Sequence, residues 1–206
     1  ESAGQAGVEM VMAGVDQSKV DKSAEEWHRN CSMEFQTESW NGMREIICFH
    51  NPDEEYGWLS NWYLSDFKVG DIEFSSMEQY MMYEKAAAFG DLKTAEKILE
   101  TQNVAIIKQY GRQVAGYNDI IWNGIRQIVV YRGLFEKFSQ NEELYEKLKK
   151  TGSGILAECA VMDRIWGIGL SMKDPNRFDM NKWRGQNLLG FAVMQVRKQK
   201  CDVSKK

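Results

Sequence analysis

The stretch SSMEQYMMYEKAAAFGD, residues Ser75 to Asp91, is typical of a well-capped helix. At 3.6 residues per turn, two charged and three apolar residues share one side of it: Glu78, Met81, Met82, Lys85 and Phe89. Tyr80, Glu84 and Ala87 are expected to lie largely away from that side. A charge on a buried face needs a partner, or a ligand that brings one. The pattern therefore predicts a helix with more than a packing role.

A capping box is one explanation for the first of these charges. The Ser75 hydroxyl can cap the helix while the Glu78 side chain, three positions on, returns to the Ser75 backbone N–H. This explanation does not extend to Lys85, which lies roughly 10 Å further along at a rise of about 1.5 Å per residue. Lys85 requires another account.

The composition bounds the class of protein. A chain of 206 residues suits one sizeable domain. Its formal net charge of -4 and pI near 5.4 speak against nonspecific binding to DNA or RNA through a broad basic face. A pocket that takes one modified nucleotide is still compatible with this charge.

The sequence also lacks targeting signals and metal motifs. No apolar run approaches the roughly 18 residues that span a bilayer, and no secretory pattern opens the chain, so we expect an intracellular, cytoplasmic protein without a membrane partner. The 4 cysteines form no CxxC pair and there are 2 histidines, which disfavours a zinc site, a disulfide scaffold and histidine-based nucleophilic catalysis. Carboxylates are then the natural catalytic groups, and we expect neither a metal nor an organic cofactor.

Periodicity divides the chain into two parts. Residues 1–40 show none and are interpreted as a cloning remnant with a flexible or loosely docked leader, whereas residues 41–200 form the patterned domain. Short strands are predicted at 44–50 and 154–160, and a hairpin at 66–74. Helices are predicted over 75–91, 94–100, 104–114, 118–141, 141–152 and 185–199. The expectation is a mostly helical α+β domain with a small antiparallel sheet.

Three loops concentrate residues that a core alone would not require. The first, YGWLSNWY, places Ser60 and Asn61 between Trp58 and Trp62. Hydrogen-bonding groups beside flat aromatic faces suit a base or sugar site. Serine and asparagine are also common turn residues, so a turn with aromatic anchors is the alternative.

The second loop, MDRIWGIGL, places Asp163 just beyond an apolar strand and ahead of Trp166 and Gly167. A GxG pattern alone is a weak phosphate signal, and without GxxxxGK[ST] a P-loop is excluded. Asp163 is a candidate catalytic carboxylate, and a helix or turn cap is its alternative role.

The third segment, KWRGQNLLG, combines Trp183, Arg184 and Asn187 at the predicted start of the last helix. A helix amino terminus can face an anion, and Arg184 could grip a phosphate, with a surface arginine beside a cap as the alternative. Arg112 and Arg126 are further phosphate candidates, although exposed arginines on helices are usually only solvated.

Together these features describe a pocket with two carboxylates, aromatic plates and several cations. Such a pocket suits a phosphorylated glycoside of a heterocycle. Cleavage of its glycosidic bond passes through an oxocarbenium-like state, which one carboxylate can stabilise or use to activate water while an acid assists the leaving group.

Six motifs in their order and spacing resemble the NADAR family, also called YbiA-like: YGWLSNWY, SSMEQYMMYEKAAAFGD, IKQYGRQV, the Trp122 helix, TGSGILAECAVMDRIWGIGL and WRGQNLLG. The resemblance covers about residues 45–197. It implies a largely helical α+β fold and N-glycosidase activity. Some members hydrolyse phosphoribosylamino-pyrimidine intermediates of riboflavin synthesis, and similar enzymes remove ADP-ribose from guanine bases of nucleic acid.

The resemblance also implies roles for individual residues. Glu78, Trp122 and Asp163 match the family's glutamate, tryptophan and aspartate, so Glu78 and Asp163 are the expected catalytic pair, with their acid and base roles unassigned. The expected substrate-binding residues are Trp58, Ser60, Asn61, Lys85, Arg112, Trp122, Arg126, Trp166, Gly167, Trp183, Arg184 and Asn187.

Three functions are open at this point. The leading hypothesis is hydrolysis of a small phosphoribosylated metabolite, which the acidic net charge favours. The alternatives are removal of ADP-ribose from guanine in DNA or RNA, and noncatalytic binding of NAD or ADP-ribose. Two carboxylates argue against a pure binder of an anionic ligand. Trp58 and Trp62 are bulkier than the family's usual residues, so the choice of substrate is undecided.

Overall fold

The structure is a computed structural model that describes residues 45–203. The leader expected at 1–40 lies outside the described residues. Six helices occur within them: α3 (Met77–Ala88), α4 (Leu92–Leu99), α5 (Val104–Arg112), α6 (Asp119–Gln140), α7 (Glu142–Lys150) and α8 (Leu188–Val203). Four short strands accompany them: β1 (Ile46–Phe49), β2 (Leu64–Val69), β3 (Ile72–Ser76) and β4 (Ile155–Glu158). The predicted mostly helical α+β fold is therefore confirmed.

The strands form two separate pairs. β2 and β3 make the predicted antiparallel hairpin, and Gly70 has the positive φ of 61° that its turn requires. β1 and β4 pair in parallel, with Cys48 opposite Ala157 and Phe49 opposite Glu158. The sequence did not predict this second pair, because strands that are far apart in the chain carry no local signal of their pairing.

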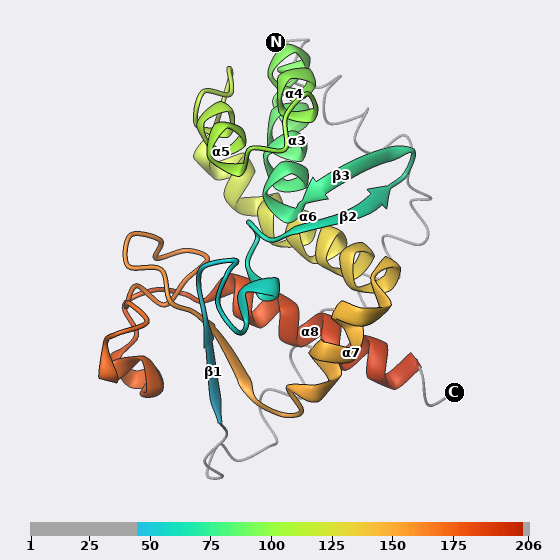
Figure 1. Cartoon of the computed structure of the whole chain (residues 1–206). Helices are drawn as coiled ribbons and strands as arrows, with labels where there is room; N and C mark the ends of the chain where they lie inside the picture. Colours follow the sequence, from blue (N-terminus) through green and yellow to red (C-terminus); the bar gives the residue numbers. More distant parts are fainter. Residues whose placement is uncertain (1–44, 204–206) are drawn as a thin grey trace.

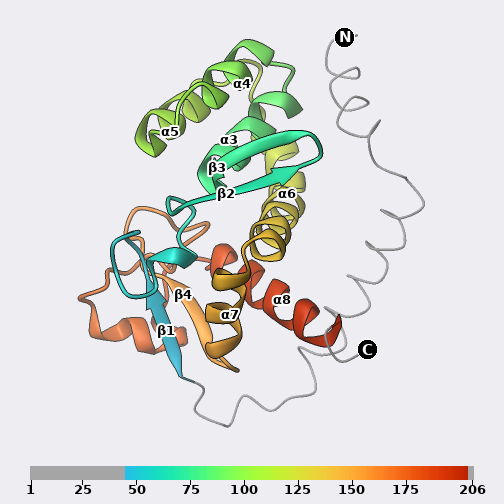
Figure 2. The same cartoon turned by 45° about the vertical axis from the view of Figure 1, so that its right-hand side comes forward.

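Helix α6 runs between an upper part, formed by the hairpin and α3 to α5, and a lower part, formed by β1, β4, α7 and α8 (Figures 1 and 2). The long segment between β4 and α8 contains two short 3-10 helices, Pro175–Phe178 and Met180–Lys182, and lies on the left in Figure 1. A third 3-10 turn, Gly57–Leu59, precedes β2. None of the helices in the described part of the chain is long and apolar enough to cross a membrane.

Helix α3 is buried on nearly every side of its first half. Tyr80 has no exposed surface, and its ring lies 6.0 Å from that of Phe67 and 5.1 Å from that of Phe74 in the hairpin. On α6, a Cβ atom at Gly133 would come within 2.4 Å of the Tyr80 ring. The prediction that Tyr80 lies away from the buried face was wrong, because the hairpin and α6 cover that side of the helix.

The cap of α3 also differs from the prediction. Ser76 caps the helix, its hydroxyl accepting a hydrogen bond from the Gln79 N–H at 3.1 Å, and the Gln79 carboxamide accepts one from the Ser75 N–H at 2.7 Å. Strand β3 extends through Ser76, so the capping residue lies one position later than predicted and the helix begins at Met77. The proposed capping box of Ser75 and Glu78 is therefore wrong, and the Glu78 side chain is left for another role.

Candidate active site

Four elements bring acidic and basic side chains together. They are the start of α3, the loop before β2, the end of β4 with the loop that follows it, and α5. The Glu78 N–H at the start of α3 donates to the Asn61 carbonyl at 2.8 Å, which fixes the loop before β2 against the helix. Helix α5 and the loop after β4 lie on the same, left-hand side of the molecule in Figure 1. Charges on α3, on α5 and on the end of β4 with its following loop are close enough to act on one another, and the Trp62 side chain of the loop before β2 donates a hydrogen bond to Glu78.

Glu78 is almost completely buried, with 3% of its surface exposed. Its Oε1 atom is buried and has no hydrogen-bond partner among residues 45–203. Burial raises the pKa of Glu78 to about 7, and the negative charge of Asp163 adds to this rise. The charges of Lys108 and Arg112 and a hydrogen bond from the Trp62 side chain oppose the rise. The carboxyl group is therefore poised to gain or lose a proton near neutral pH.

Glu158, at the end of β4, is a second such carboxyl group, and sequence reasoning missed it. Its Oε2 atom is buried without a hydrogen-bond partner in the described part of the chain. Burial raises its pKa to about 8, and the negative charges of Asp163 and Glu78 add to this effect while Lys108 opposes it. The signal was a single acidic residue at the end of the apolar strand GILAE.

Asp163 has the capping role that the sequence offered as its alternative, and its charge also reaches Glu78 and Glu158. Its Oδ1 atom accepts hydrogen bonds from the N–H groups of Ile165 at 3.0 Å and Trp166 at 2.8 Å, which is the predicted turn cap. The same carboxylate is close enough to raise the pKa values of Glu78 and Glu158. The cap fixes its position, and its charge acts on the two buried glutamates.

Asn187 holds β4 in place rather than lining a pocket. It is completely buried in a left-handed conformation, with φ of 53°. Its side-chain oxygen accepts from the Glu158 N–H at 3.0 Å, and its side-chain nitrogen donates to the Leu156 carbonyl at 2.8 Å. Gly167 accepts from the Asn187 N–H at 3.1 Å and is crowded by the Glu158 and Asp163 carbonyls, 2.8 and 2.9 Å from where a Cβ would lie. Both residues, which the sequence predicts to bind substrate, support the backbone of Glu158 and Asp163.

Three other predicted binding residues gather on one side of α6. Trp122 and Arg126, one turn apart on this helix, are 6% and 9% exposed. The Arg126 guanidinium carbon lies 5.9 Å from the centre of the Trp166 ring, which is half-buried. The backbone of Trp166 is in turn held by Asp163. These contacts place an aromatic and cationic group beside the acidic residues.

Several predicted binding residues have structural contacts instead. Trp58 packs edge-on against Phe138 in the core, with ring centres 6.2 Å apart and 6% of its surface exposed. The Lys85 side chain donates to the Gly111 carbonyl at 2.7 Å, and its Nζ atom lies 4.1 Å from the centre of the Tyr117 ring. These two contacts join α3 to α5 and to the turn before α6. They account for the second charge on the α3 stripe.

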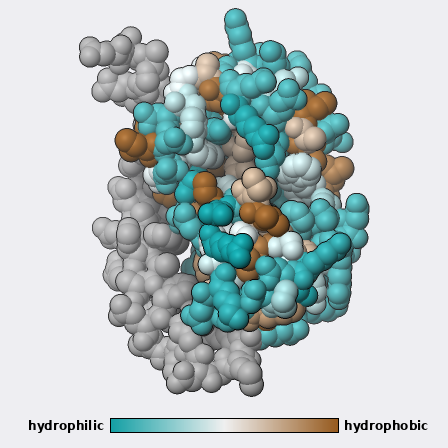
Figure 3. Space-filling view, turned by 90° about the vertical axis from the view of Figure 1, so that its left-hand side faces the viewer, coloured by the Kyte–Doolittle hydropathy of each residue, from teal (hydrophilic) through white to brown (hydrophobic). Residues whose placement is uncertain are grey.

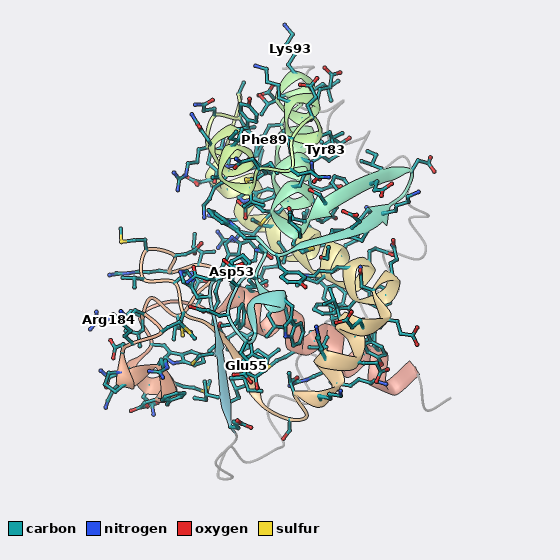
Figure 4. The ribbon with its side chains drawn as sticks, in the orientation of Figure 1. Asp53, Glu55, Tyr83, Phe89, Lys93 and Arg184 are labelled. Carbon is teal, nitrogen blue, oxygen red and sulfur yellow. The ribbon has the colours of Figure 1, made fainter. Side chains whose placement is uncertain are left out.

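The remaining predicted binding residues differ in their burial and in their contacts. Ser60 and Asn61 are buried; the Ser60 hydroxyl accepts from the Trp62 N–H at 3.3 Å, and the Asn61 side-chain oxygen has no partner among the described residues. Trp183 donates to the Arg177 carbonyl at 2.9 Å. Arg184 is exposed and projects from the outer side of the loop after β4 (Figure 4). Arg112 is exposed but close enough to lower the pKa of Glu78.

The face that carries α5 and the loop after β4 is mainly hydrophilic, with small hydrophobic groups near its centre (Figure 3). Within residues 45–203, no group of three or more His, Cys, Asp and Glu side chains is arranged to hold a metal ion. What this face offers is two buried carboxyl groups with shifted pKa values, a capped carboxylate, and cations beside aromatic rings. This set can exchange protons with a bound molecule and bind its negative charge.

Comparisons with known proteins found relatives over most of the chain. An N-glycosidase of Acanthamoeba polyphaga mimivirus is 39% identical over 75% of this chain and 96% of its own length. The solution structure of YbiA from Escherichia coli, at 26% identity, matches 79% of this chain and 89% of that one with a TM-score of 0.67, and this protein is named an N-glycosidase. A riboflavin biosynthesis protein of Vibrio vulnificus is 31% identical over 77% of this chain and 40% of its own.

The profile of the NADAR domain matches residues 48–199, close to the range that the sequence motifs indicated. Its boundaries include α3, β4 and the loop of Asp163, so every acidic residue of the site lies inside the matched region. The chain therefore belongs to the NADAR domain family and is a glycosidase like the N-glycosidases that it resembles.

Proposed function

We propose that the protein hydrolyses the N-glycosidic bond of a phosphoribosylated heterocycle, such as a ribosylaminopyrimidine phosphate of early riboflavin synthesis. The observation that carries the proposal is the pair of Glu78, which is buried, and Glu158, which is half-buried. Each has a buried carboxyl oxygen without a partner among the described residues, and both are close to Asp163 and Lys108. Cleavage of such a bond needs one group that gives a proton and one that takes it. The relationship to a riboflavin biosynthesis protein supports this substrate class.

The two pKa values suggest how the roles divide. Glu158, with a pKa of about 8, holds its proton at neutral pH and gives it to the departing nitrogen of the heterocycle. Glu78, with a pKa of about 7, takes a proton from the attacking water. The bond between the anomeric carbon and nitrogen breaks, the water oxygen bonds to that carbon, and the products are ribose phosphate and the free heterocycle.

Asp163 and the aromatic residues complete this scheme. The Asp163 carboxylate, held by two backbone N–H groups, stabilises positive charge that develops on the sugar. Trp122 and Trp166 supply the flat apolar surface that a heterocycle requires. The positive charge of Lys108 opposes the rise of both glutamate pKa values. It thereby favours the ionised form of Glu78, which takes the proton from the attacking water.

Leaving-group dependence tests this division of roles. A substrate with a nitrophenol leaving group on ribose 5-phosphate needs no proton from the enzyme, whereas an aminopyrimidine does. Glu158→Gln should lose about 100-fold or more of its kcat on the aminopyrimidine substrate and little on the nitrophenyl one, within the range of general acid catalysis. Glu78→Gln should lose activity on both substrates. Equal losses on both substrates in Glu158→Gln would contradict its role as the acid.

Removal of ADP-ribose from guanine is the second candidate, since it breaks the same kind of bond. One observation favours it: Val161 and Met162, directly before Asp163, are 53% and 94% exposed, and such an apolar rim could contact neighbouring bases. The net charge of -4 favours the small substrate. Val161→Ser with Met162→Ser should weaken turnover of an ADP-ribosylated guanine oligonucleotide, and not that of the small substrate, if the second candidate is correct.

A further inference from the structure

Arg126 is a buried cation for which the described part of the chain supplies no hydrogen-bond acceptor. Only 9% of its surface is exposed, and its Nε atom is buried without a hydrogen-bond partner. Among residues 45–203, no carboxylate forms an ion pair with its guanidinium group. An arginine whose side chain is mostly removed from water, and whose Nε atom is buried without an acceptor, is unfavourable without an anion, so such a position indicates that a ligand brings the negative charge.

Two other buried cations show that this fold normally provides acceptors. Arg197 is equally buried, and it donates to the Thr151 hydroxyl at 2.6 Å and to the Gly154 carbonyl at 2.8 Å. Lys137, with no exposed surface, donates to the Trp58 carbonyl at 2.9 Å. Arg126 is as buried as Arg197, but unlike Arg197 and Lys137 it has no hydrogen-bond acceptor in the described part of the chain.

The surroundings of Arg126 face the candidate active site. Its guanidinium carbon is 5.9 Å from the ring centre of Trp166, whose N–H group is bound by Asp163. Burial and Asp119 raise the pKa of Tyr117, near the start of α6, and the charge of Arg126 is close enough to oppose this shift. Lys108 and Arg112, rather than Arg126, are the cations that oppose the raised pKa of Glu78. The guanidinium group therefore lies on the Trp166 side of the candidate site, and the acidic residues do not engage it.

We propose that Arg126 anchors the phosphate of the substrate, in a subsite formed with Trp166 at the side of α6. This inference rests on the proposed function, because it assigns the phosphate end of the same substrate. A guanidinium group presents several N–H donors in a plane and matches the oxygens of a phosphate. A ribose monophosphate and the pyrophosphate of an ADP-ribosyl group share this chemistry, and titration with each distinguishes them.

Binding of the product sugar tests the subsite without any turnover. Calorimetric titration with ribose 5-phosphate should show at least tenfold weaker binding to Arg126→Gln than to wild type, partly restored in Arg126→Lys. Arg132→Gln, which removes an exposed arginine from the same helix, should bind like wild type. Equal binding to wild type and Arg126→Gln would overturn the proposal, as would an equal loss in Arg132→Gln. A parallel titration with ADP-ribose shows which phosphate group the subsite prefers.

Thermal unfolding provides a second, independent readout. Arg126→Met should have a melting temperature equal to or above that of wild type, since it removes a buried charge without a partner, whereas Arg197→Met should melt lower. Ribose 5-phosphate should raise the melting temperature of wild type and not that of Arg126→Met. A lower melting temperature of Arg126→Met in the absence of ligand would show that the fold itself uses this charge. If these results hold while no substrate is turned over, the phosphate subsite stands and the proposed hydrolysis fails.

Discussion

Glu78 and Glu158 have the same side chain, and each has an acid–base role set by its surroundings. Burial raises both pKa values, and the negative charge of Asp163 raises them further, to about 7 and about 8. In the proposed mechanism, Glu78 must be ionised and Glu158 must be protonated. We therefore predict a narrow, bell-shaped pH profile of kcat/KM, which rises near pH 7 and falls near pH 8. The two limbs belong to the coupled pair. A profile that is flat between pH 6 and pH 9 would contradict this assignment.

The sequence predicted some of these residues and missed others for a physical reason. Glu78, Trp122 and Asp163 lie in recognisable motifs, so a resemblance could indicate them. Glu158 and Lys108 join the site only because β4 pairs with a strand far away in the chain and α5 folds back over α3. Asn187 was predicted to bind substrate from its place at the start of the last helix, and its two hydrogen bonds to β4 leave no pattern in the sequence. Roles set by non-local backbone contacts require the structure.

At the scale of elements, the close approach of α6 to α3 depends on a single glycine. A Cβ atom at Gly133 would lie 2.4 Å from the Tyr80 ring and 2.9 Å from Met77, whereas Gly124 on the same helix has no neighbour within 4 Å of such an atom. Gly133→Ala should therefore lower the free energy of unfolding by about 1–3 kcal/mol. Gly124→Ala is the matched control and should raise it by about 0.5–1 kcal/mol, from helix propensity. Urea unfolding measures both, and equal effects would argue against the α3–α6 contact.

Helix α6 also holds the loop before β2 through Lys137. This side chain is fully buried, donates to the Trp58 carbonyl, and has a pKa lowered by burial to about 7. In the unfolded chain its pKa is near 10.5, so the unfolded state binds more protons between pH 7 and pH 10. Lys137 therefore makes the wild type more stable as the pH rises through this range. The free energy of unfolding of wild type relative to Lys137→Met should increase by about 1–3 kcal/mol from pH 7 to pH 9. A constant difference would contradict the shift.

The mixed fold was predictable at this scale, although its details were not. Helical periodicity and the turn at Gly70 indicated every helix and the antiparallel hairpin within the described residues. The parallel pair of β1 and β4 was not predicted. Tyr80 was expected on the side of α3 away from the core, whereas it is completely buried. Periodicity shows that a helix has an apolar stripe, but it does not show how many neighbours surround the helix.

At the scale of the whole molecule, the candidate site should reduce the stability of the fold. The folded pKa values of Glu78 and Glu158 lie above the unfolded value of 4.5, so their contribution to stability is fully present below pH 4.5 and is lost as the pH rises to about 8. The double variant Glu78→Gln with Glu158→Gln should therefore exceed wild type in stability at pH 8 by about 1–4 kcal/mol. The two proteins should differ much less at pH 5. Denaturant unfolding at both pH values measures this, and a wild type that is the more stable protein at pH 8 would contradict it.

Product analysis tests the central claim most directly. Wild type and Glu78→Gln, each shown to be folded by circular dichroism, are incubated with a ribosylaminopyrimidine phosphate and, separately, with an ADP-ribosylated guanine oligonucleotide, and the products are quantified by mass spectrometry. The proposed function predicts equal amounts of free pyrimidine and ribose phosphate from the first substrate with wild type, and loss of both products in the variant. Release of ADP-ribose from the second substrate alone would make the protein a nucleic-acid hydrolase, and full activity of Glu78→Gln on the first substrate would contradict the catalytic role of the buried glutamates.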